Sequence, residues 1–253
     1  MKRYVIYILL YLCVIFITIW VLDSPTLNKL GKEDGLFEYL TAIYLLVASA
    51  FFFLSYKKSK LKYQNIQIKP ATNYFYLILA IIFFFGFGEE ISWGQRILNV
   101  KTPEFLTEIN VQKEINIHNI ELINLTDKNG KLKPFWIRYL TTIAGLFSLF
   151  CLFYCILVPL AFRYLYFCKK WLQKIYFPIV PIEIGFFFLA SWIMYYFSIY
   201  MLPSKDDEIL SSLGEIKECN IAFLFMVIAF YFLKHVSIPI TKKERESLLS
   251  GVD

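Results

Sequence analysis

Carboxylates that lie in or beside long apolar segments are the residues of this sequence best suited to chemistry. Glu89 and Glu90 end one apolar run, and Glu38 lies about one helical turn inside another. A charged side chain at mid-bilayer costs about 2.5 to 3.5 kcal/mol on translocon scales, and the cost falls toward the interface. A carboxylate placed there needs a partner or a task, such as acid–base catalysis or metal binding.

The most specific pattern covers residues 88–96, with the sequence Gly-Glu-Glu-Ile-Ser-Trp-Gly-Gln-Arg. If the preceding helix continues through it, Glu89, Trp93 and Arg96 share one face at i, i+4 and i+7. One glutamate could then pair with Arg96 while the other faces the interior of a helix bundle. Burial favours a protonated carboxyl and a nearby guanidinium favours an ionised one, so the two glutamates could act as acid and base.

Polar residues also occupy every second position from residue 110 to residue 118. In an extended chain this spacing projects all of them toward one face. The row consists of Asn110, Gln112, Glu114, Asn116 and His118, and Asn119 follows it directly. His118 is one of two histidines in the chain and the only one expected on the outer side. We therefore treat it as a candidate base or metal ligand.

The residues predicted to act together near the outer membrane interface are Glu38, Glu89, Glu90, Arg96 and His118. Carboxylates and an imidazole can activate water directly. A divalent metal is a candidate cofactor, with Glu89, Glu90 and His118 as ligands, because such an ion lowers the pKa of bound water. Supporting roles are expected for Asp34, Trp93, Gln95, Gln112, Glu114, Asn116 and Asn119. Acids such as Asp34 and Glu38 at a helix start also complement the helix dipole, which is the simpler interpretation of Asp34.

The composition shows which elements must position these residues. The chain has 253 residues, 58% hydrophobic and 18% charged, with a mean hydropathy of +0.56. Soluble domains contain about 25% charged residues. The composition therefore excludes a soluble enzyme, a disordered chain and a small disulfide-stapled protein. We predict one all-α integral membrane domain that covers residues 1–253.

About 20 apolar residues, at roughly 1.5 Å of rise each, cross the hydrocarbon core of a bilayer. Six runs of the sequence meet this requirement, so we predict a bundle of about six transmembrane helices. The predicted spans are Tyr4–Leu22, Leu36–Tyr56, Asn73–Trp93, Phe135–Phe162, Phe177–Leu202 and Asn220–Ile238. The first run is too long for the apolar region of a signal peptide, and we interpret it as a retained anchor.

Charged residues set the orientation of these spans. Lysines and arginines cluster on one face of the predicted topology, which the positive-inside rule makes cytoplasmic, together with both termini. Only four of the 20 acidic residues lie outside the predicted outer segments and outer helix ends: Glu183, Glu244, Glu246 and Asp253. Lysines and arginines beside anionic lipid account for the net charge of +6 without a nucleic-acid partner. We therefore expect a protein of the plasma membrane, with the bilayer as its first partner.

Three outer segments follow from this topology, at residues 23–35, 94–134 and 203–219. Apolar residues recur throughout the middle segment, so we expect it to be an ordered, partly interfacial insert between the third and fourth spans. Thr102 and Pro103 are suitable as the cap and first residue of a short amphipathic helix that ends near Asn110 and lies at the membrane surface.

Three motifs resemble those of a family of bacterial multi-pass membrane proteins to which no activity is assigned. They are Glu33-Asp34-Gly35-x-x-Glu38, the sequence of residues 88–96, and Asn110-x-Gln112-x-Glu114-x-Asn116-x-His118-Asn119. The resemblance covers about the first half of the chain and implies architecture only. The paired glutamates are also similar to the EExxxR motif of CAAX-type intramembrane proteases. However, Arg96 follows Glu90 by six residues instead of four, and no Phe-x-x-x-His or His-x-x-x-Asn motif follows.

Three functions fit the sequence. The first is a membrane hydrolase or transferase with a carboxylate/His site at the outer interface, acting on a lipid-borne substrate. The second is a non-catalytic subunit or scaffold of a membrane complex, in which the same polar cluster locks the outer insert onto the bundle. The third is an ion or proton-coupled transporter, although the sequence shows no inverted repeat.

Overall fold

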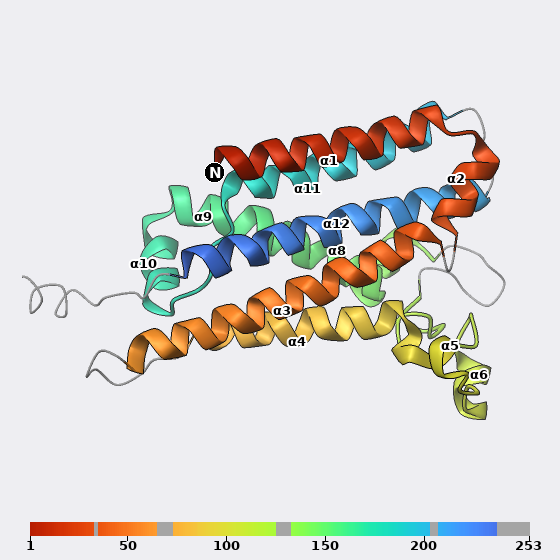
Figure 1. The fold of residues 1–253 in the computed structure, drawn as a ribbon, viewed down its shortest axis with the longest axis horizontal. Helices are drawn as coiled ribbons and strands as arrows, with labels where there is room; N and C mark the ends of the chain where they lie inside the picture. Colours follow the sequence, from red (N-terminus) through yellow and green to blue (C-terminus); the bar gives the residue numbers. More distant parts are fainter. Residues whose placement is uncertain (33–34, 65–72, 125–132, 203–206, 237–253) are drawn as a thin grey trace, which may run out of the picture.

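The computed structural model describes residues 1–32, 35–64, 73–124, 133–202 and 207–236, and they form a bundle of long helices (Figure 1). This part of the chain contains no β-strand, and one isolated antiparallel bridge joins Asn110 and Ile120. In chain order the elements are α1 (Lys2–Val21), α2 (Ser24–Gly31), α3 (Leu36–Gln64), α4 (Tyr74–Glu90), the 3-10 turn η1 (Ser92–Gly94), α5 (Gln95–Leu98), α6 (Glu104–Ile109), α7 (Phe135–Thr141), α8 (Ile143–Cys151), the π-helical η2 (Leu152–Leu157), α9 (Val158–Tyr164), α10 (Tyr166–Lys174), α11 (Ile182–Met201) and α12 (Asp207–His235).

Within the described part of the chain, five helical stretches are long and apolar enough to cross a membrane. They are Lys2–Val21, Ser24–Ser59, Ile143–Tyr164, Ile182–Met201 and Glu208–His235. The predicted helical membrane architecture therefore agrees with the structure in its coarse form. The remaining predicted span corresponds to α4, whose 17 residues extend roughly 25 Å, less than the roughly 30 Å of a hydrocarbon core. A sixth crossing by α4 stays a prediction.

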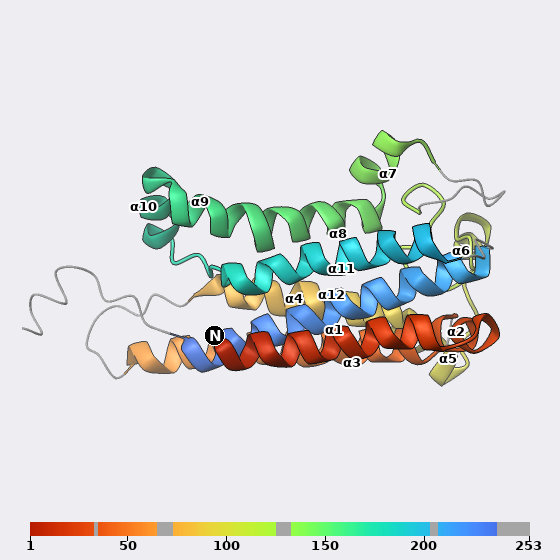
Figure 2. The same ribbon diagram turned by 90° about the horizontal axis from the view of Figure 1, so that it is seen from above.

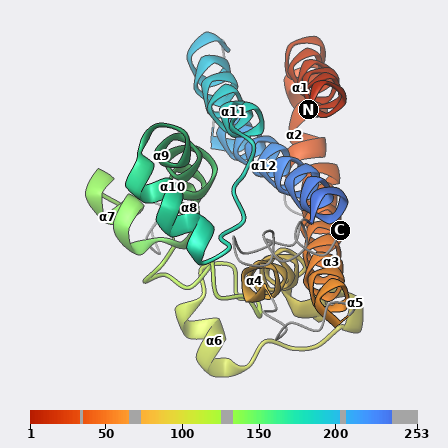
Figure 3. The ribbon, with the colours of Figure 1, turned by 90° about the vertical axis from the view of Figure 1, so that its left-hand side faces the viewer.

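Helix α12 lies at the centre of the bundle, next to α3 and α11, and α4 packs along α3 (Figures 1 and 3). Aromatic side chains fill the space between these helices. The ring of Phe225 in α12 lies 4.7 Å from that of Phe83 in α4 and 5.1 Å from that of Phe188 in α11. The Ser49 hydroxyl donates to the Ala80 carbonyl at 2.8 Å, which fixes α4 against α3. The core thus holds the end of α4 in a defined position.

The two ends of the bundle differ in charge. The start of α1, the end of α12 and helices α9 and α10 lie together at one end, and α2, α5 and α6 lie at the other (Figures 1 and 2). We call the first the basic end, because it carries Lys2, Arg3, Lys169, Lys170 and Lys234. Glu38 and Glu90 lie at the opposite end. The predicted sorting of acidic residues to one face and the assignment of the basic end to the cytoplasm both stay predictions.

The predicted fourth and fifth spans begin too early. The chain from Phe135 forms the separate helix α7, because Thr142 is extended and caps α8, its hydroxyl accepting from the Gly145 N–H at 3.1 Å. Helix α11 begins at Ile182 rather than Phe177, since Pro178 and Pro181 lack the N–H that a helix interior requires.

The last helix corrects another prediction. Helix α12 begins at Asp207, so most of the expected outer segment 203–219 is helical and the expected start at Asn220 is wrong. The added turns bury Ile209, Leu213 and Ile216 against α1, α2 and α3, and the same turns carry Glu208, Glu215, Lys217 and Glu218. Hydropathy averaged over this stretch is low because one helix face is apolar and the others are charged. An amphipathic extension of a span is therefore missed by counting apolar residues.

Candidate functional site

The polar site is built on a sharp left-handed turn at the end of α4. Helix α4 ends at Glu90, and Ser92, Trp93 and Gly94 then have φ angles of 46°, 52° and 79°. The helix therefore does not continue, and the i, i+4, i+7 face expected for Glu89, Trp93 and Arg96 does not form. Each non-glycine residue in the left-handed region costs roughly 1–2 kcal/mol. Such a turn persists only where its surroundings hold it in place.

The turn folds the Trp93 indole back onto the last turn of α4. A Cβ on Gly88 would lie 2.8 Å from the nearest ring carbon of Trp93, so only glycine leaves room for this arrangement. The Phe85 ring contacts the same indole edge-on, with ring centroids 5.3 Å apart. The Trp93 indole thus packs against the last turns of α4, and its nitrogen points to a carboxylate of that helix.

That carboxylate is Glu89, which is 6% exposed and joins α4 to the outer insert. Its Oε1 accepts from Trp93 Nε1 at 2.7 Å, and its Oε2 accepts from the backbone N–H groups of Ile117 and His118 at 2.6 and 2.9 Å. The His118 ring nitrogen Nδ1 lies 3.3 Å from the same Oε2. Hydrogen bonds to the charged form favour an ionised carboxylate.

A second group of hydrogen bonds surrounds the fully buried Ser92. The Ser92 hydroxyl donates to Glu114 Oε2 at 2.6 Å, and Asn116 Nδ2 donates to both Ser92 Oγ and Glu114 Oε2 at 3.1 and 2.9 Å. Asn110 Nδ2 donates to the carbonyl and side-chain oxygens of Asn116, both at 2.9 Å. Asn110 Oδ1 accepts from the backbone N–H of Gln112 at 2.9 Å. The strained turn and the polar row are therefore one hydrogen-bonded unit.

A third group fixes α5. Gln95 Oε1 accepts from the Ile115 N–H, and Gln95 Nε2 donates to Thr102 Oγ1, both at 2.6 Å. The Thr102 hydroxyl in turn donates to the Lys113 carbonyl at 2.6 Å. Thr102 therefore does not cap α6, which begins at Glu104 after Pro103. The predicted short helix near residues 103–110 is nevertheless present.

The polar row is not extended, so the expectation of a single alternating face is wrong. The backbone of residues 109–121 doubles back on itself: the Val111 N–H donates to the Asn119 carbonyl at 2.8 Å, and the Glu121 N–H donates to the Ile109 carbonyl at 2.9 Å. Lys113 takes a φ of 59° inside this loop. Asn119 Nδ2 donates to Gln112 Oε1, and Asn124 Nδ2 donates to Asn119 Oδ1 at 3.0 Å. The polar side chains meet because the loop closes around them.

The structure brings together only part of the predicted catalytic group. Glu89 and His118 are in contact, and Trp93, Gln95, Glu114 and Asn116 belong to the same network. Glu90 interacts electrostatically with Glu215 and Glu218 of α12 and with Glu38 of α3, as well as with the adjacent Glu89. Glu38 and Glu215 have further interactions of their own. Adjacent positions thus serve two environments, with Glu89 facing the insert and Glu90 facing the acids of the neighbouring helices.

Two predicted residues lie beyond what the structure describes. They are Asp34 and the side chain of Arg96, so the expected pairing of Arg96 with a glutamate stays a prediction. Within the described residues, no three His, Cys, Asp or Glu side chains are grouped so that they could hold a metal ion.

Four residues of the network were not predicted as site residues: Ser92, Thr102, Asn110 and Asn124. Asn110 was noted only as the first residue of the polar row. Ser92 lies within the most specific motif, and its position between Glu90 and Trp93 was the available signal. Nothing in the spacing of Thr102 or Asn124 indicates their contacts, since both depend on how the loop closes. No protein-family model, curated protein or solved structure matches this chain. Function is therefore inferred from the contacts of the site itself.

Proposed function

We propose that the polar cluster is a structural lock and that the protein is a non-catalytic subunit or scaffold of a membrane complex. The lock consists of Glu89, Ser92, Trp93, Gln95, Asn110, Glu114, Asn116 and His118. One observation carries this proposal. The Glu89 carboxylate is buried, and three N–H groups of Trp93, Ile117 and His118 donate to it. Polar groups at membrane depth require such partners, and here Trp93 of the turn and Ile117 and His118 of the insert supply them.

The strength of these hydrogen bonds supports a structural role. A hydrogen bond to a charged group contributes about 1.5–3 kcal/mol to stability. Two of the bonds to Glu89 are enough to offset the cost of two left-handed non-glycine residues, at roughly 1–2 kcal/mol each. The carboxylate therefore stabilises both the turn and the insert. An oxygen that already accepts two backbone N–H groups has little capacity left to take a proton from a substrate.

The lock holds in place a segment that exposes large apolar side chains. Helices α5 and α6 lie outside the bundle, beside the end of α4 (Figures 1 and 3). Ile97, Leu98 and Phe105 are 78%, 71% and 64% exposed on them. An ordered element that presents large apolar side chains fits a protein or membrane interaction site. We propose that this apolar surface, Ile97, Leu98 and Phe105, docks on another membrane protein at the outer interface.

The decisive experiment replaces Glu89 by glutamine in the full chain. A glutamine amide offers one acceptor and two donors, so at least one of the three N–H groups loses its partner, at a cost of about 1–3 kcal/mol. We expect Glu89→Gln to lower the Tm in detergent by several degrees. The matched control is Glu108→Gln on the exposed side of α6, which should leave the Tm unchanged. Equal Tm values for both variants would overturn the lock.

The docking proposal has its own experiment. Cross-linking in native membranes should join the wild-type chain to a distinct membrane protein, and Leu98→Asp should abolish that product without lowering the Tm. If Leu98→Asp leaves the cross-linked product unchanged, or if cross-links form only to lipid, the partner part of the proposal fails.

Added EDTA should leave the Tm unchanged, because the described residues contain no group suited to holding a metal ion.

A hydrolase is the second candidate, and one observation favours it. The His118 side chain is 36% exposed while Nδ1 lies 3.3 Å from the buried Glu89 carboxylate. A carboxylate that orients an imidazole in this way can prepare it as a general base for water. His118→Gln separates the two candidates, because it keeps the backbone N–H groups that bind Glu89. If the protein is a hydrolase, the wild type hydrolyses phospholipid esters in mixed micelles and His118→Gln does not, with an unchanged Tm. If the cluster is only a lock, neither the wild type nor His118→Gln shows turnover.

A further inference from the structure

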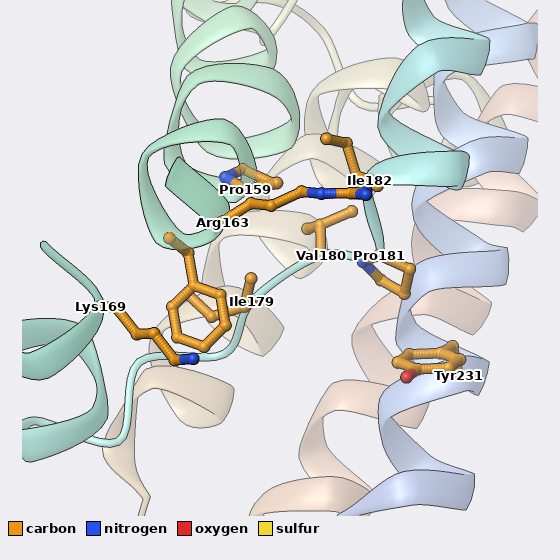
Figure 4. Close-up of a pocket in the computed structure, with 9 residues that line it drawn as sticks. Pro159, Arg163, Lys169, Ile179, Val180, Pro181, Ile182 and Tyr231 are labelled. Carbon is orange, nitrogen blue, oxygen red and sulfur yellow. The ribbon is translucent and has the colours of Figure 1, made fainter. Parts of the chain in front are cut away.

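The basic end of the bundle contains a cavity of about 420 Å³ that the polar lock does not use (Figure 4). It lies between the end of α9, the start of α10, the connection of residues 179–182 and helix α12. Most of its wall is apolar or aromatic, including Phe162, Ile179, Pro181 and Tyr231. Ligand cavities are typically about 300–1,000 Å³ and combine an apolar wall with a few polar groups. The volume therefore suits a small ligand or a lipid headgroup.

Two cations supply the polar groups of this cavity. Arg163 comes from the last turn of α9 and Lys169 comes from α10, and the extended residue Leu165 between the helices turns the chain so that both line the space. Figure 4 shows the Arg163 side chain reaching across toward Ile182 and the Lys169 side chain extending from the neighbouring helix. No acidic side chain is among the lining residues. The cavity therefore selects for an anion.

The cations are not neutralised within the described part of the protein. Arg163 lies 5.7 Å from the ring of Tyr164 and Lys169 lies 5.9 Å from the ring of Phe162, and neither forms an ion pair with a described residue. Glu183, in the first turn of α11, acts electrostatically on Tyr231 but does not line the cavity. Two positive charges beside an apolar wall remain available to a ligand. A guanidinium presents paired donors that match a phosphate, and an ammonium adds a compact charge.

The surroundings of the cavity indicate where the anion comes from. Tyr164, Tyr166, Phe167 and Trp171 lie on α9 and α10, the two helices that supply Arg163 and Lys169, and are 70%, 81%, 78% and 54% exposed. Exposed aromatic side chains beside lysines are typical of the headgroup zone of a membrane. The anion concentrated at that depth is the lipid phosphate, and basic pockets between membrane helices bind anionic headgroups. An apolar wall at the same place would contact the glycerol and the first acyl carbons.

We propose that this cavity binds the headgroup of an anionic phospholipid, with Arg163 and Lys169 contacting the phosphate. The ligand comes from the leaflet at the basic end of the bundle. This site lies at the opposite end from the lock, so it is independent of the proposed docking function. Its role is to hold α9 and α10 against the 179–182 connection.

The test uses the purified full chain in a neutral detergent. Adding phosphatidylglycerol should raise the Tm in a saturable manner, whereas phosphatidylcholine should not. Arg163→Gln and Lys169→Gln should each weaken the apparent affinity at least tenfold. The matched control is Lys170→Gln, the exposed neighbour on α10 outside the cavity, which should keep the wild-type affinity. Arg163→Lys keeps the charge but loses the paired donors, so its apparent affinity for phosphatidylglycerol should lie between those of the wild type and Arg163→Gln. This variant controls for misfolding of Arg163→Gln.

Three outcomes overturn the proposal. An equal loss of affinity in Lys170→Gln means that diffuse surface charge, and not the cavity, attracts the lipid. Saturation by inorganic phosphate at the same concentration as by phosphatidylglycerol means that the ligand is a free anion. An equal rise in Tm with phosphatidylcholine means that the effect is that of any bilayer lipid.

Discussion

Two glycines in the last turns of α4 provide a matched test of how Trp93 holds the lock together. Replacing either glycine by alanine improves helix propensity by the same amount, about 1 kcal/mol. The two positions differ only in what the new methyl group meets. At Gly86 the nearest atom is Leu45 Cδ1 at 3.5 Å, which is ordinary contact. At Gly88 three ring carbons of Trp93 lie at 2.8 to 2.9 Å, so the indole must move.

The expected magnitude follows from the contact that Trp93 loses. Its Nε1 donates to Glu89 at 2.7 Å, and a hydrogen bond to a charged group contributes about 1.5–3 kcal/mol. Because the propensity gain cancels between the variants, Gly88→Ala should be less stable than Gly86→Ala by about 1.5–3 kcal/mol. In proteins of this size, 1 kcal/mol shifts the Tm by roughly 2–4 °C. The Tm difference should therefore be roughly 3 °C or more.

The assay is thermal unfolding of both variants in the same detergent, followed by limited trypsin digestion. Lys101 and Lys113 are exposed in the insert and provide cleavage sites. We expect Gly88→Ala to be cleaved there faster than the wild type, and Gly86→Ala to be cleaved at the wild-type rate. If the two variants have the same Tm and the same digestion rate, Trp93 does not hold the turn and the reasoning is refuted.

The remaining predictions concern single contacts. Trp93→Phe keeps an aromatic side chain but removes the N–H donor to Glu89, so it should lower stability by about 1.5–3 kcal/mol in thermal unfolding, and an unchanged Tm would contradict the assigned bond. Gly185→Ala, in the bundle core, should lower both expression and Tm, because a Cβ there would clash with the Cys155 carbonyl oxygen. Expression and Tm equal to wild type would contradict this packing. Asn99→Gly should be neutral and Asn99→Val destabilising by roughly 1–2 kcal/mol, because residue 99 has a φ of 51°; equal Tm values would contradict the left-handed conformation.

Hydropathy predicts the long helices well because apolar side chains occur along the whole length of each one, both on its buried face and on its exposed face. It misplaces the ends wherever another force decides them. Thr142 caps α8 and so separates α7 from the predicted span, and the prolines at 178 and 181 delay α11. The first turns of α12 are helical because Ile209, Leu213 and Ile216 pack against other helices, which an average over all faces conceals.

The composition of the site could also be predicted, but its geometry could not. Glu89 and His118 were singled out by residue type and position, and the structure places them in contact. Their contact depends on a left-handed turn at Ser92 and Trp93, a conformation that residues other than glycine rarely adopt. The role of Glu89 depends further on backbone N–H groups of Ile117 and His118, which carry no signal in the sequence. Residue types thus indicate which side chains are unusual, and chain closure decides their partners.

Hydrogen exchange at two backbone amides tests the lock most directly. The N–H groups of Ile117 and His118 lie in an irregular loop, and their acceptor is the Glu89 carboxylate. Exchange measured by mass spectrometry on a peptide covering residues 115–121 should be slow in the wild type and in Glu108→Gln. It should be at least tenfold faster in Glu89→Gln. Equal exchange rates in all three proteins would contradict the claim that Glu89 fastens the outer insert to the helix bundle.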